Sequence, residues 1–217
     1  HASSPKGKAS IGNIVIRTIA ESNTQLAELF SGGIDWIWKV KPDQAERIKS
    51  QGAFTVKNSS TMRIGYLNFD AMGRHSKNPM NDVRVRRAIA HSIDREGIVK
   101  ALVQGESIVV NSLCFPSQFG CTQDVPTYDY NPEKAKKLLA EAGYPNGLKL
   151  NLVASNRPAI RAQVAIAIKQ MALSAGFDIN VETMPHDTYI ANVWKKGKFY
   201  MAYWGMQPTE DATFNLL

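Results

Sequence analysis

The sequence has no apolar run approaching the ~18 residues that a membrane-spanning helix needs. We therefore expect no membrane span, and the N-terminus does not predict a signal peptide. No G-x-S-x-G, no H-E-x-x-H and no phosphate-binding glycine loop is present, and there are only four histidines. These absences favour a globular protein that is not an enzyme and holds neither a cofactor nor a metal.

Cysteine is equally scarce, with only Cys114 and Cys121 in the chain. A metal site would need further ligands, and the histidines nearest in sequence, His75 and His91, are not at zinc-finger spacing. A local disulfide fits better and would stabilise the fold by up to about 2–3 kcal/mol in the chain-entropy model. It would also indicate an oxidising compartment such as the bacterial periplasm. Two unrelated buried thiols are the alternative.

Acidic residues are outnumbered, 19 against 26 basic ones, so the formal net charge is +7. Most basic residues stand singly on the polar faces of expected helices, as do Lys134, Lys136 and Lys137. No helix-turn-helix signature and no alternation of arginine with aromatic residues is present. We therefore expect a solvated basic surface and no nucleic-acid partner.

The 217 residues have 44% hydrophobic and 21% charged content, which is typical of an ordinary globular protein. This length allows one domain or a pair of lobes. Residues 1–10, H-A-S-S-P-K-G-K-A-S, are small, polar and basic. We expect them to be a flexible lead-in or an expression remnant.

Hydrophobic periodicity predicts strands alternating with helices, and hence an α/β fold with a mixed, mostly parallel sheet covered by helices. The first strand–helix–strand run, within residues 13–40, indicates a βαβ unit. We expect strands over 13–20, 34–40, 54–56, 63–69, 148–154, 177–183 and 199–204. We expect helices over 23–30, 42–52, 82–93, 94–103, 131–143, 158–176 and 186–196.

Ligands of open parallel sheets bind at the carboxyl ends of strands. Two segments fall at such ends, Ser155 to Pro158 and Trp204 to Pro208. This topology predicts a ligand site that combines the two segments.

Three stretches, in order along the chain, resemble one protein family. They are T-M-R-I-G-Y-L-N-F-D (61–70), D-V-R-V-R-R-A-I-A-H-S-I-D-R-E-G-I-V (82–99) and Y-D-Y-N-P-E-K-A-K-K-L-L-A-E-A-G-Y-P-N-G (128–147). They resemble the signatures of the peptide- and nickel-type substrate-binding proteins of bacterial ABC importers. The third is the most specific.

The resemblance implies a fold and a role. Members of that family are clamps with two lobes, of the periplasmic-binding-protein type II fold, and are about twice this length. Residues 11–217 would then be the second, ligand-closing lobe of a periplasmic monomer. That protein would capture a peptide or other small polar solute and deliver it to an ABC permease in the inner membrane. The alternative is that the same lobe serves as the ligand-sensing domain of a regulator. Free thiols at the two cysteines would support this alternative.

The resemblance also suggests ligand-binding residues. In dipeptide-binding relatives an arginine in an x-R-P turn pairs with the ligand carboxylate, and Arg157 matches that position. An aspartate three residues after a tryptophan holds the ligand amine, but here Trp204 is followed by the neutral Gln207. An ammonium buried against an amide alone is costly, which argues against a zwitterionic peptide. Glu210 and Asp211 are equally suited to replace that aspartate or to cap a helix.

Aromatic residues on the expected strands complete the candidate site. Tyr66 and Asn68, from the G-Y-L-x-F-N-like strand, and Trp204 are the expected ligand-lining residues. Most strand aromatics are core residues, which is what we expect of Trp36 and Trp38.

Overall fold

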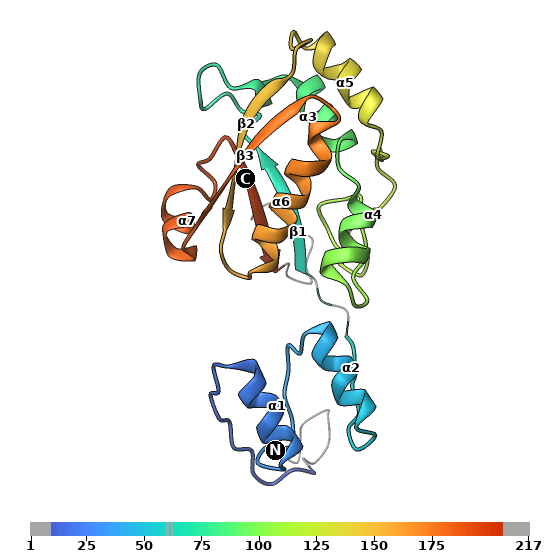
Figure 1. The fold of residues 1–217 in the computed structure, drawn as a ribbon, viewed down its shortest axis with the longest axis vertical. Helices are drawn as coiled ribbons and strands as arrows, with labels where there is room; N and C mark the ends of the chain where they lie inside the picture. The colour runs from blue at the N-terminus through green and yellow to red at the C-terminus, as the bar shows by residue number, and fades with distance from the viewer. Residues whose placement is uncertain (1–9, 60, 62, 206–217) are drawn as a thin grey trace. The chain divides into compact units, whose positions relative to one another are not determined.

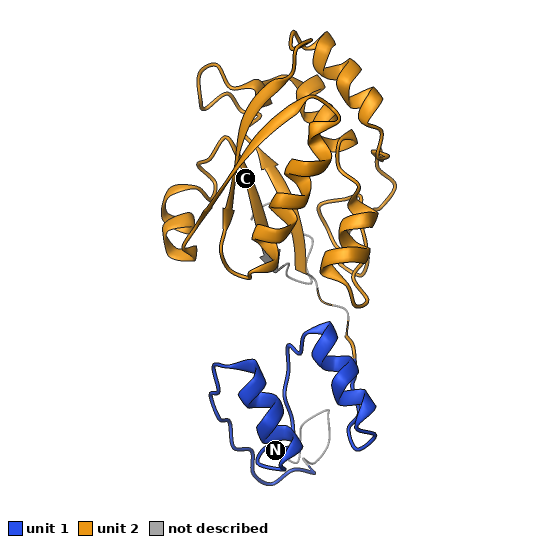
Figure 2. Ribbon diagram, viewed as in Figure 1, with its two compact units in different colours: residues 1–57 blue, residues 58–217 orange. Residues whose placement is uncertain are grey.

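The structure, a computed structural model, describes residues 10–59, 61 and 63–205. The chain forms two compact units, residues 1–57 and residues 58–217 (Figure 2). No helix among the described residues is both long and apolar enough to cross a membrane.

Unit 1 contains two short helices, α1 (Ser22–Phe30) and α2 (Pro42–Ser50). A glutamate caps α1, because its carboxylate accepts a hydrogen bond from the amide of Thr24 at 2.8 Å. Proline at the first position starts α2 without losing a helical hydrogen bond. The small core between the helices consists of Leu26, Leu29 and Ile48.

The strands expected in unit 1, over 13–20, 34–40 and 54–56, are absent, so the predicted βαβ unit is wrong. A strand needs a neighbour for its backbone hydrogen bonds, and β-branched sequence alone does not supply one. The described part of unit 1 offers no such neighbour to these segments. Val15 is accordingly 85% exposed and Trp36 71% exposed, and the core placement expected of Trp36 and Trp38 is also wrong.

Unit 2 contains the sheet that the sequence predicts. Its strands are β1 (Arg63–Phe69), β2 (Leu148–Ser155), β3 (Phe177–Met184) and β4 (Phe199–Gly205). The spatial order is β1-β4-β2-β3 (Figure 1). The β2 strand runs parallel to both β3 and β4, whereas β1 is antiparallel to β4. The expected mixed, mostly parallel sheet is confirmed.

The remaining elements of unit 2 are helical. They are η1 (Pro79–Asn81), α3 (Val83–His91), α4 (Arg95–Ile98), the π-helical η2 (Val99–Val103), α5 (Pro132–Glu141), α6 (Ile160–Leu173) and α7 (His186–Asn192). The side chains of Asp82, Asp94 and Asn131 cap α3, α4 and α5. The apolar residues of 98–103 are only partly buried, since Val103 is exposed to solvent.

The larger core lies on the face of the sheet that α3, α5 and α6 cover (Figure 1). Alternate residues of β2, β3 and β4 point into it, and buried aliphatic residues of the helices meet them. Its strand residues are Leu152, Ala154, Phe177, Ile179, Phe199 and Met201. The backbones that precede β2 and β3 pack closely at Gly147 and Gly176. A Cβ on Gly147 would lie only 2.6 Å from the carbonyl oxygen of Gly176, so a larger residue would not fit there without a shift.

The other face of the sheet packs against α7 in a second, aromatic core. Tyr200 and Ala202 of β4 point to this side, and Tyr189 and Val193 pack over them. The hydroxyl of Tyr189 donates a hydrogen bond to the carbonyl oxygen of Met201 at 2.8 Å. This contact ties α7 to the middle of β4.

The long loop between η2 and α5 contains a disulfide. Cys114 and Cys121 are joined, with their Cα atoms 5.7 Å apart, so the predicted disulfide is confirmed. Cys114 and Phe115 pack against Ile64 of β1. The disulfide therefore closes a loop that rests on the edge strand of the sheet.

A buried carboxylate ends β1. Asp70 is fully buried and accepts hydrogen bonds from Arg74 Nε at 3.0 Å and His75 Nδ1 at 2.7 Å. Arg74 also donates to the carbonyl oxygen of Lys195, and Asn78 donates to that of Asp70. Burial alone would raise the pKa of Asp70, but the hydrogen bonds from His75 and Arg74 outweigh it and lower the pKa to about 2.

We expect Asp70→Asn to lower the free energy of unfolding by about 2 kcal/mol at pH 7, because two donors lose a buried anionic acceptor. The folded-state pKa lies below the unfolded value of 3.8, so this stability is present above pH 4. It is lost as the pH falls from about 4 to about 2. Urea denaturation across this range would show the loss in the native protein and a smaller one in the variant. Asp178→Asn, at an exposed carboxylate, is the control.

Candidate functional site

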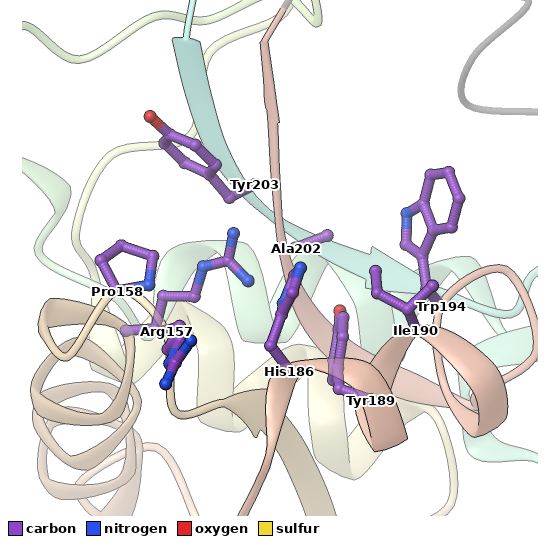
Figure 3. Close-up of a pocket in the computed structure, with 9 residues that line it drawn as sticks. Arg157, Pro158, His186, Tyr189, Ile190, Trp194, Ala202 and Tyr203 are labelled. Atoms are coloured by element: carbon purple, nitrogen blue, oxygen red, sulfur yellow. The ribbon is translucent and has the colours of Figure 1, made fainter. Parts of the chain in front are cut away.

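A cavity of about 460 Å³ opens at the carboxyl end of β2, between the start of α6, the α7 segment and β4 (Figure 3). This is one of the strand ends at which the sequence predicts a ligand site. In Figure 3, His186 and Tyr189 rise between Pro158 and Tyr203 on the left and Trp194 on the right. The lining residues are Arg157, Pro158, Arg161, His186, Tyr189, Ile190, Trp194, Ala202 and Tyr203.

Arg157 lies in the turn that connects β2 to α6, and its side chain is exposed. The buried hydroxyl of Ser155 holds this turn by accepting from the amide of Arg157, and it lies 3.2 Å from the carbonyl oxygen of the same residue. The same hydroxyl is also 3.2 Å from Nδ1 of His186 at the first turn of α7. The Ser155 side chain thus links the backbone of Arg157 to the ring of His186.

Arg161, in the first turn of α6, is the most unusual residue of the cavity. Its side chain is only 6% exposed, and its guanidinium lies over the ring of Tyr203 at 5.0 Å from the centroid. The Nε atom is buried and has no hydrogen-bond partner in the described structure. Burial lowers the pKa of Arg161, while the neighbouring tyrosines, Tyr189 first, act in the opposite direction. A guanidinium remains charged despite such a shift.

Aromatic side chains form the opposite wall. Burial raises the pKa of Tyr66, and the neighbouring Trp194 acts in the opposite direction. Desolvation by burial raises the pKa of Tyr189, and the electrostatic interaction with the neighbouring Tyr200 raises it further. The wall is therefore apolar, and its phenol groups stay neutral.

The cavity is basic on one side and apolar on the other. Arg157, Arg161 and His186 line it, and none of its lining residues within the described part of the chain is a carboxylate. The described residues contain no group of three or more histidine, cysteine or acidic side chains placed to hold a metal ion. The arrangement is suited to binding an anionic group next to an apolar one.

The structure brings some of the predicted site residues to the cavity and not others. Arg157 lines the cavity, whereas Tyr66 lies behind its wall. Asn68 pairs with Tyr200 across the β1–β4 ladder and is not among the lining residues. Trp204 lies in β4 opposite Ile64. Two further groups of predicted residues, Gln207 and the acidic pair Glu210 and Asp211, lie outside the described residues.

Arg161 was not predicted, although the sequence contains a signal for it. Val164, Ala165 and Ile168 follow it at the spacing of one helix face, and all three are buried. An arginine on such a stripe is an exception, since charged residues are rarely buried without a partner. The same pattern does not reveal where its guanidinium points.

The sequence profile described as "Bacterial extracellular solute-binding proteins, family 5 Middle" matches residues 5–217. The chain is 29% identical over 157 residues to heme-binding protein A of Haemophilus influenzae, covering 72% of this chain and 28% of that protein. It is also 29% identical over 145 residues to the dipeptide-binding protein of Escherichia coli, covering 67% and 26%.

A solved structure, the ABC transporter substrate-binding protein CtaP from Listeria monocytogenes, shares the fold with a TM-score of 0.87. Its sequence is 19% identical, and the match covers 100% of this chain and 45% of that one. The chain therefore spans less than half the length of these relatives. The match over residues 5–217 shows that the chain belongs to family 5 of the bacterial extracellular solute-binding proteins.

Proposed function

We propose that residues 11–217 are the second, ligand-closing lobe of the substrate-binding component of an ABC importer. The protein would capture a peptide-like or other small polar solute in a cleft between two lobes and deliver it to a membrane permease. Affinity would come largely from closure of the lobes around the solute. The observation that supports this most is the cavity at the carboxyl end of β2, with Arg157 at its rim.

The matched relatives support a binding role without naming one solute. Their names include heme-binding, dipeptide-binding and glutathione-binding proteins. Solved structures of similar fold were determined with the peptide STSA, with Met-Leu and with mannopinic acid. A fold that accepts such different solutes leaves their selection to residues of the site. We therefore propose a solute with an acidic group, on the basis of the basic lining of the cavity.

The extracytoplasmic location is part of the same proposal. The family is named as extracellular, and the disulfide between Cys114 and Cys121 fits an oxidising compartment. A reduced pair would instead favour the ligand-sensing domain of a regulator.

Native mass spectrometry of the full-length protein, purified from its host, tests the binding role. We expect a copurified small solute with at least one acidic group, released on denaturation. A bound solute without any acidic group would rule out the role given to Arg157. A tightly bound simple dipeptide would contradict the inference drawn from Gln207.

Substitution of the rim arginine tests the position of the site. We expect Arg157→Gln to weaken binding of the copurified solute roughly 10- to 100-fold, because a charge-assisted hydrogen bond is lost. The melting temperature of the ligand-free protein should not change, since the Arg157 side chain is exposed. Arg87→Gln removes the same charge from the exposed face of α3 and is the matched control. Affinities are measured by titration calorimetry. Equal affinities of the Arg157→Gln and Arg87→Gln variants would show that Arg157 is not part of the binding site.

Thiol titration tests the compartment. The native protein should show no reactive thiol until it is reduced and unfolded. Replacing both cysteines by serine should lower the free energy of unfolding by about 2–3 kcal/mol, because the unfolded chain loses a closed loop. Two free thiols in protein isolated from the host, under conditions that block exchange, would favour the regulator.

A further inference from the structure

We propose that Arg161 is the principal anion-binding residue of the cavity and that it takes a carboxylate next to an apolar group of the solute. This inference rests on the proposed function and names the class of solute. It concerns the floor of the cavity, whereas Arg157 lies at the exposed rim.

The first support is a buried charge that has no acidic partner among the described residues. Taking a guanidinium out of water is costly unless an anion or several acceptors replace the water. Arg161 is 6% exposed, and its described contacts are the ring of Tyr203 and no carboxylate. The buried Nε has no acceptor in the part of the chain that the structure describes. A charge retained under these conditions is explained by an anion that binds there.

The second support is the direction in which the guanidinium is held. A planar guanidinium can bond through its edge while an aromatic ring covers its face. The ring of Tyr203 occupies one face of the Arg161 guanidinium. Arg161 and Tyr203 both line the cavity, and because Nε is buried, the edge that a ligand within the cavity would meet is the one that carries the two terminal nitrogens. A carboxylate matches this edge with two parallel hydrogen bonds.

The third support is the apolar wall. Tyr189, Ile190 and Trp194 line the same cavity as Arg161. The Tyr189 hydroxyl is already bonded to the carbonyl oxygen of Met201, so it presents mainly its ring. An aliphatic or aromatic group next to the carboxylate would therefore be buried against this wall. Such a group is present in a hydrophobic residue at a peptide carboxyl terminus and in an arylacetic acid.

If the inference is right, replacing Arg161 by an apolar residue of similar size weakens ligand binding but does not destabilise the ligand-free protein. If Arg161 serves the ligand, the empty protein bears the cost of its desolvated charge, and an apolar residue of similar size removes that cost. If Arg161 instead pairs with a carboxylate of the chain that lies outside the described residues, its removal leaves that partner unpaired and destabilises the protein. Melting of the ligand-free protein separates the two.

The experiment uses the full-length protein, freed of solute by unfolding and refolding. The probes are phenylacetate, its neutral counterpart phenylacetamide, and inorganic phosphate. The variants are Arg161→Met, Arg161→Lys and, as a control with the same loss of charge, Arg87→Met. Calorimetry measures affinity, and thermal melting without ligand measures stability.

The wild-type protein and Arg87→Met should bind phenylacetate and not phenylacetamide. Arg161→Met should bind phenylacetate roughly 10- to 100-fold more weakly than the wild type does. The affinity of Arg161→Lys should lie between those of the wild type and Arg161→Met, because lysine keeps the charge but lacks the two parallel donors of a guanidinium. Ligand-free Arg161→Met should melt at the same temperature as the wild type or higher.

The assignment to Arg161 is overturned if Arg161→Met binds phenylacetate like the wild type, or if it melts several degrees lower or does not fold. Absence of phenylacetate binding by the wild type, or binding of phosphate in its place, overturns the carboxylate class. Retention of the copurified solute by Arg161→Met would contradict this inference and leave the proposed function intact. A wild-type protein that carries no solute from its host would contradict the proposed function, whatever phenylacetate does.

Discussion

The pairing of β4 with both β1 and β2 is the constraint on which unit 2 depends. Phe199 and Met201 of this strand enter the larger core, and Tyr200 and Ala202 enter the aromatic core under α7. Because β4 runs parallel to β2, their carboxyl ends point the same way. The cavity opens on that side, since residues following β2 and residues late in β4 both line it. One central strand thus supports two cores and one site.

Unit 2 was predictable because its local and long-range signals agree. Capping residues such as Asp82, Asp94 and Asn131 begin helices whose apolar stripes meet a sheet within the same unit. Unit 1 shows the reverse. Residues 13–20 have strong β propensity, yet pairing is a long-range property, and the described chain supplies no neighbouring strand. Propensity without a partner leaves Val15 in solvent.

The candidate site was only partly predictable for a related reason. Topology placed the turn containing Arg157 at a strand end, and the structure places it at the rim of a cavity. The floor residue, Arg161, lies one helical turn later on a stripe that otherwise reads as core. Its role depends on the ring of Tyr203, about forty residues further along the chain, and on the absence of a described acceptor for Nε. Neither property is local, so neither is visible in the sequence pattern alone.

Under the proposed function, two arginines four residues apart would divide the binding of an anion according to their burial. The exposed Arg157 can meet an anion while still hydrated, which suits first capture, because a solvated charge acts at low cost and over a longer range. The buried Arg161 has already lost its water, so an anion that reaches it gains a stronger electrostatic interaction. That gain is largest once water is excluded from the cavity. Lobe closure would exclude it, and the stored desolvation cost of Arg161 would then favour the closed, ligand-bound state over the open one.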